Sequence, residues 1–143
     1  MSLHPMAVLT VTPRIVAVLA LMGALAMSTA SAQSWDRNLS PAYAACTTKA
    51  NSQSAATLDC LEKEGRRQDV RLNEAYKALM ADLDAGGKKA LLEAQRSWLK
   101  FRADNTRYVS STMSGSFGAS MASQTFVTMT ADRAAELEEF ARP

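Results

Sequence analysis

Apolar residues between about residue 40 and residue 140 recur every three to four positions, which is the period of an α-helix. No stretch alternates apolar and polar residues for long enough to form a strand, and no repeat of about 20 to 50 residues is visible. The pattern therefore predicts an all-α fold, a small helical bundle of about four helices. Two of these helices should be long and two short.

The first helix is expected to be short. Ser40 followed by Pro41 is typical of an N-cap and the first helical position, and the apolar pattern ends near Lys49. The polar residues 51–54 then predict a turn.

A long second helix is expected to begin at Ser54 or Thr57 and to end near Leu83. Gly65 is a weak point near its start, because glycine lowers helix stability. Its apolar positions are Leu58, Leu61, Val70, Leu72, Tyr76 and Leu79.

The second half of the chain is predicted to hold two more helices separated by a loop. The glycine pair at 86–87 predicts a turn, after which a helix runs from about Lys88 to Tyr108. Residues 111–120 are rich in serine and glycine and predict an exposed loop. The last helical segment is expected to break near Thr130, which would act as an N-cap with Asp132 in the following turn.

The N-terminal segment has the three parts of a cleavable secretory signal. Arg14 precedes an apolar run at residues 15–27, and small residues at 30–32 form an A-x-A site before Gln33. A membrane anchor is the alternative, but a run of about 13 residues is too short to span a bilayer. We expect a signal peptide at 1–32 and a single domain at 33–143, periplasmic or secreted and without stable membrane insertion.

Charge and histidine content narrow the classes of function. The chain has 16 basic and 14 acidic residues, and Arg14 leaves with the signal, so the exported domain is nearly neutral. Nucleic acid is therefore not expected as a partner. The one histidine, His4, also leaves, which removes the usual general base and the commonest metal ligand. We expect no enzyme activity, no metal and no cofactor, and we interpret the glutamates at 136, 138 and 139 as a solvated face.

Cys46 and Cys60 are the two cysteines of the chain. In an exported protein an even number of cysteines favours a disulfide. A redox or metal role is the alternative, but the spacing is far from C-x-x-C and no histidine is available. In a helical hairpin turning at residues 51–54 both cysteines would lie at similar heights, so the bridge is geometrically reasonable.

Polar side chains interrupt a face that should pack against the core. Leu91, Gln95, Trp98 and Arg102 fall within about 60° of one another on a helix. One interpretation is an internal polar network in which Arg102 lies along the Trp98 ring and pairs with a partner. The candidate partners are Asp69, Asn73, Glu74 and the region of Thr130.

The alternative interpretation is a binding surface. Arg102, with Arg96 or Lys100, would reach into the acidic cleft of a partner protein. A second candidate surface is the predicted loop at 111–123, where Phe117 lies between glycines with Met113 nearby. Phe117 could instead fold back onto the core, and the sequence leaves both interpretations open.

Three stretches, "DVRLNEAYKALM", "LLEAQRSWLKFR" and "TMTADRAAEL", together with the cysteine pair, make the chain resemble the LprI-type lysozyme-inhibitor family. The resemblance implies an exported helical protein that binds and inhibits lysozyme; the alternative is an envelope interaction module of the same fold with another protein partner. Family members commonly carry a second cysteine pair, and Thr106 and Thr125 stand near those places here. The markers are Cys46, Cys60, Asp69, Leu72, Asn73, Tyr76, Gln95, Trp98, Arg102, Thr130, Arg133 and Leu137.

Overall fold

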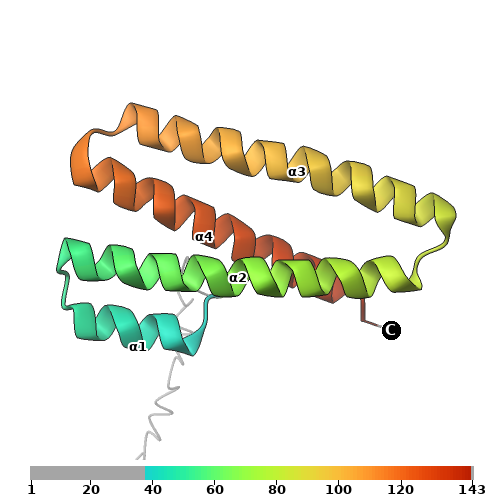
Figure 1. Ribbon diagram of the computed structural model, residues 1–143, viewed down its shortest axis with the longest axis horizontal. Helices are drawn as coiled ribbons and strands as arrows, with labels where there is room; N and C mark the ends of the chain where they lie inside the picture. Colours follow the sequence, from blue (N-terminus) through green and yellow to red (C-terminus); the bar gives the residue numbers. More distant parts are fainter. Residues whose placement is uncertain (1–37, 143) are drawn as a thin grey trace, which may run out of the picture. The chain divides into compact units, whose positions relative to one another are not determined.

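Four α-helices make up the part of the chain that the computed structural model describes, residues 38–142 (Figure 1). They are α1 (Pro41–Ala50), α2 (Ser54–Asp82), α3 (Ala85–Thr112) and α4 (Gly115–Phe140). Residues 38–142 contain no strand, so the all-α prediction is confirmed. The predicted lengths are wrong, because three helices are long and only α1 is short. The predicted signal at 1–32, its cleavage site and His4 lie outside the described residues.

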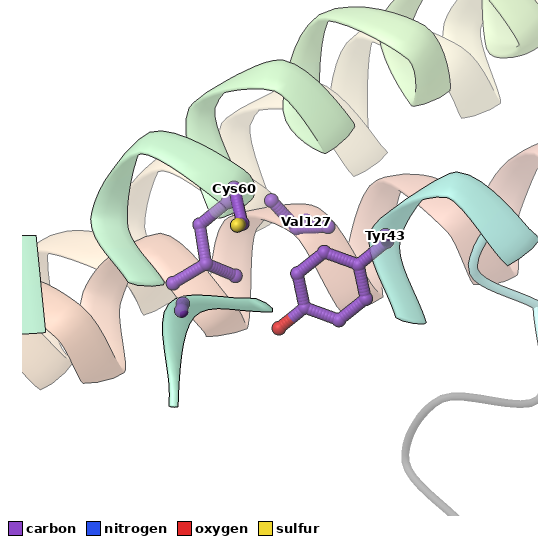
Figure 2. Packing of buried hydrophobic residues seen from close by; sticks show 5 residues of the cluster. Tyr43, Cys60 and Val127 are labelled. Atoms are coloured by element: carbon purple, nitrogen blue, oxygen red, sulfur yellow. The ribbon is translucent and has the colours of Figure 1, made fainter. Parts of the chain in front are cut away.

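Helix α4 is the central element of these four helices, since it packs against both α2 and α3, while α1 packs on α2 (Figure 1). Two apolar clusters result. The first is shown in Figure 2 around Tyr43 of α1, Cys60 of α2 and Val127 of α4. The second joins α2 to α4 through Leu72, Ala75, Leu79, Ala134 and Leu137. Within residues 38–142 no helix combines the length and apolarity that crossing a bilayer requires.

The start of helix α1 and its covalent attachment to α2 agree with the prediction. The Ser40 hydroxyl accepts a hydrogen bond from the Tyr43 backbone N–H at 3.1 Å, and Pro41 occupies the first turn. The Cys46–Cys60 disulfide joins α1 to α2 with a Cα–Cα distance of 5.7 Å, which confirms the predicted bridge. The chain reverses at Asn51, which has a φ of 45° in the left-handed region.

The start of α3 differs from the prediction. Gly87 lies in the first turn of the helix, where its backbone N–H donates to the Asp84 carboxylate at 2.7 Å. Asp84 is therefore the N-cap, and the connection from α2 needs only Leu83 and Asp84. Helix α3 also continues to Thr112, four residues beyond the predicted end at Tyr108.

The predicted exposed loop at 111–123 is wrong. Helix α3 ends at Thr112 and α4 begins at Gly115, so only Met113 and Ser114 connect them. The glycines serve a tight turn rather than a flexible loop. Gly115 has a φ of +67°, and a Cβ at Gly118 would lie 2.1 Å from the Met113 carbonyl oxygen. Thr106 and Thr125, the places of the family's second cysteine pair, therefore lie within helices.

The predicted break at Thr130 is also wrong. Thr130 is fully buried in the middle of α4, and its hydroxyl donates to the Phe126 carbonyl oxygen at 2.7 Å. This bond to the preceding turn satisfies the hydroxyl within a continuous helix. Asp132 consequently lies in the helix interior, where its carboxylate accepts a hydrogen bond from the Asn38 side chain at 2.6 Å.

Candidate functional site

Arg102 joins the three long helices. From its position on α3, its Nη1 donates to Asp69 Oδ1 on α2 at 2.9 Å and to Thr130 Oγ1 on α4 at 2.8 Å. Only 14% of the Arg102 side chain is exposed, whereas 43% of the Asp69 side chain is. A cation at this depth requires such partners, because an unpaired buried charge is strongly destabilising.

Two aromatic rings flank the Arg102 guanidinium. Its central carbon lies 5.0 Å from the centroid of the Trp98 ring and 4.3 Å from that of Phe126. These distances are typical of cation–π contacts, and the planar guanidinium can also stack on the aromatic faces. Trp98 is half-buried and packs against the second apolar cluster. Phe126 on α4 was not predicted to take part.

Arg133 forms a second group of contacts between α3 and α4. Its Nε donates to Gln95 Oε1 at 3.1 Å, and its Nη1 lies 2.7 Å from Glu136 Oε2. Gln95 and Arg133 are both buried, so this contact lies inside the domain. Asn73 lies outside it: the side chain is exposed and forms no hydrogen bond with the residues of the described range.

A fully buried carboxylate at Glu64 was not predicted. Its Oε1 accepts from the Ser40 backbone N–H at 2.7 Å and its Oε2 from the Ser40 hydroxyl at 2.6 Å. Gln68 and Arg67 donate at 2.6 Å and 2.8 Å. Burial alone would raise the pKa of Glu64, but the hydrogen bonds from Ser40, Gln68 and Arg67 outweigh it and lower the pKa. The available signal was the helical spacing of Cys60, Glu64 and Gln68, which places polar side chains in the apolar stripe.

Glu138 corrects the interpretation of the C-terminal glutamates as a purely solvated face. Its two carboxylate oxygens accept from Nε and Nη2 of Arg71, each at 2.6 Å. This bidentate pair links α4 to α2; it lowers the pKa of Glu138 and raises that of Arg71. Glu136 and Glu139 pair with Arg133 and Arg142.

A groove of about 450 Å³ runs between α2 and α3 beside the Arg102–Asp69 pair. Six of the residues that carried the family resemblance contribute to its lining, although they span positions 69 to 102 of the sequence. None of the other described pockets is lined by as many of these residues, and we take this groove as the candidate site. Its lining is Asp69, Leu72, Asn73, Tyr76, Leu92, Gln95, Arg96, Leu99 and Arg102.

The four candidate contact residues fall on two separate surfaces. Arg96 is exposed in the groove, and Arg102 lies at its edge with its guanidinium already engaged. Phe117 is 64% exposed in the first turn of α4, and Met113 is 38% exposed at the end of α3. About 25 Å of helix separates Arg96 from Met113, at 1.5 Å per residue.

No group of three or more histidine, cysteine, aspartate or glutamate side chains that could hold a metal occurs in residues 38–142. The groove is lined by the Arg96 guanidinium, the amides of Asn73 and Gln95, the Tyr76 phenol and several leucines.

A comparison with known families gives a match. A family model described as "Lysozyme inhibitor LprI" matches residues 46–137. The matched range begins at the disulfide and includes the whole polar network and the groove. No curated protein and no solved structure shows significant similarity to the chain.

Proposed function

The chain belongs to the LprI lysozyme inhibitor family, and from this premise we propose that it binds a lysozyme and blocks cell-wall hydrolysis. One observation carries the proposal: the family match covers residues 46–137, from the disulfide in α1 to buried Leu137 in α4. It therefore rests on the whole helical domain and not on a short motif.

We propose further that the protein is exported. The support is the tripartite segment at 1–32 and a disulfide that favours an oxidising compartment. Cleavage would leave a domain of residues 33–143 in the periplasm or outside the cell. Intact mass and N-terminal sequencing of the exported protein should give Gln33 as its first residue, whereas a product that keeps Met1 would contradict cleavage.

The proposed mechanism is steric binding and not catalysis. The family description is that of an inhibitor, and His4, the chain's one histidine, lies in the predicted signal. A lysozyme has a sugar-binding cleft with two carboxylates across the scissile bond, and an inserted protein surface would exclude the polysaccharide.

Titration against lysozymes of several structural types tests the proposal. The full chain is expressed with its own leader, and the exported product is purified and added to each enzyme during cell-wall lysis. Calorimetry measures binding directly. Saturable inhibition with a midpoint that matches the calorimetric Kd supports the proposal.

A second substrate separates enzyme binding from substrate binding. If the protein binds the lysozyme, inhibition persists when a short soluble chitooligosaccharide replaces the cell wall. If it coats the cell wall instead, inhibition disappears with the soluble substrate. Absence of binding to every lysozyme would refute the inhibitor proposal and favour an envelope module with a different partner.

A further inference from the structure

The α2–α3 groove carries one uncompensated positive charge. Asp69 and Arg102, two of its three charged residues, neutralise each other at 2.9 Å. The third, Arg96, is exposed and has no ion pair with any residue in the range 38–142. The groove therefore favours an anionic group from a partner.

Leucines border Arg96 on the same face of α3. Leu92 and Leu99 lie four residues before and three residues after it, and they are 37% and 41% exposed. Tyr76 and Asn73 line the groove from α2. An arginine and a tyrosine among apolar side chains are typical of the centre of a protein interface, where excluded water strengthens ion pairs.

The polar network holds this face in place. Gln95, the neighbour of Arg96, accepts from Arg133 of α4, and Arg102 binds both Asp69 and Thr130. These contacts fix α3 against α2 and α4 on both sides of Arg96. A surface that is already ordered loses less conformational entropy on binding.

We propose that this face, Leu92, Arg96 and Leu99 with Asn73 and Tyr76 opposite, docks onto the acidic sugar-binding cleft of a lysozyme. The proposal rests on the function proposed above. Arg96 would pair with a catalytic carboxylate, because a guanidinium presents two N–H groups that match the two oxygens. The leucines would cover the apolar walls of the cleft and shield the pair from water.

The surface at the other end of α3 fits an acidic cleft less well. Arg107, the cation nearest to Met113 and Phe117 in the sequence, already pairs with Asp104 at 2.8 Å, and neither Phe117 nor Met113 carries a charge. Charge complementarity therefore favours the groove.

The test compares Arg96→Glu and Leu92→Asp with two control variants in the inhibition and calorimetry assays. Lys49→Glu makes the same charge change at an exposed lysine of α1 that has no ion pair with residues 38–142, and Phe117→Ser alters the other surface. We expect Arg96→Glu to weaken binding by about thirtyfold or more and Lys49→Glu by less than about twofold. Thermal melting should show that Arg96→Glu folds normally, because Arg96 has no partner to lose.

Ionic strength gives a second measurement. Inhibition by the wild type should weaken between low and high salt, and Arg96→Gln should reduce that dependence. If the wild type inhibits a lysozyme while Arg96→Glu and Leu92→Asp both bind it within about twofold of wild type, the docking surface is wrong. A loss confined to Phe117→Ser would move the surface to the other end of α3. A wild type that binds no lysozyme would instead overturn the proposed function itself.

Discussion

Arg102 and Asp69 form an ion pair, with Nη1 2.9 Å from Oδ1, between two helices that both pack on α4. The two partners differ in exposure, at 14% for the arginine side chain and 43% for the aspartate. Removing Asp69 would leave a cation with little access to water, whereas removing Arg102 would leave a carboxylate that water can solvate. The two truncations should therefore have unequal costs.

We expect Asp69→Ala to lower the free energy of unfolding by about 2 kcal/mol and Arg102→Met by less than about 1 kcal/mol. Methionine keeps the apolar stem between Trp98 and Phe126. The double variant should be more stable than Asp69→Ala alone, because it removes the unpaired charge. Urea unfolding of the wild type, the two single variants and the double variant makes up a double-mutant cycle. If the two single effects add up to the effect of the double variant, Arg102 and Asp69 are not energetically coupled.

The helices of this domain could be predicted because their signals are local. Ser40 and Pro41 mark the start of α1, and the apolar period defines the long helices. The error at 111–123 has a physical cause. Serine and glycine are typical of loops, but Gly118 is required here by the close approach of the Met113 carbonyl oxygen across the short α3–α4 turn, a backbone geometry that composition does not reveal.

The candidate site could be predicted only in part from the sequence, because its contacts depend on how the helices pack. The period of α3 placed Gln95 and Arg102 on a packing face, which predicts polar partners without identifying them. Which helix supplies a partner depends on how the helices pack. The Arg71–Glu138 pair spans 67 positions of the sequence, and nothing local to either residue indicates it.

Stability should depend on pH through Glu64. Its pKa lies below the ordinary value of 4.5, so the ionised form is favoured by folding. The contribution is fully present above that value and is lost as the pH falls through the lower pKa of the folded state. We expect thermal melts to show a steady loss of stability below about pH 4.5. Glu138, whose pKa is lowered by Arg71, adds to the same trend.

Glu64→Gln isolates this contribution. At pH 7 it should cost about 2–3 kcal/mol, because an amide cannot accept all the hydrogen bonds that Ser40, Gln68 and Arg67 donate. The difference from wild type should shrink in acid, where the wild-type carboxyl is itself protonated. Glu74→Gln, at an exposed carboxylate, is the matched control. A deficit for Glu64→Gln that stays constant down to pH 3 would contradict the assignment.

Replacing both Cys46 and Cys60 by alanine should cost about 3 kcal/mol, since the bridge closes a loop of about 15 residues. Helix α1 keeps other attachments, because Ser40 binds Glu64 and Tyr43 belongs to the first apolar cluster. We therefore expect a lower melting temperature with faster amide exchange in Pro41–Ala50, while α2, α3 and α4 stay helical. Two free thiols in the exported wild type, found by mass spectrometry without reductant, would contradict the bridge.

Two glycines within helices should respond differently to replacement by alanine. In a helix interior this change normally stabilises by about 1 kcal/mol. At Gly65 the new Cβ would meet Val127 Cγ2 at 3.4 Å, which is ordinary contact, so Gly65→Ala should be neutral or slightly stabilising. At Gly118 it would lie 2.1 Å from the Met113 carbonyl oxygen, and only movement of the backbone could relieve that overlap. Gly118→Ala should therefore lose about 2 kcal/mol despite its better helix propensity. Thermal melts of the two variants test this expected difference in stability. If Gly118→Ala is as stable as Gly65→Ala, the α3–α4 turn is looser than this close approach requires.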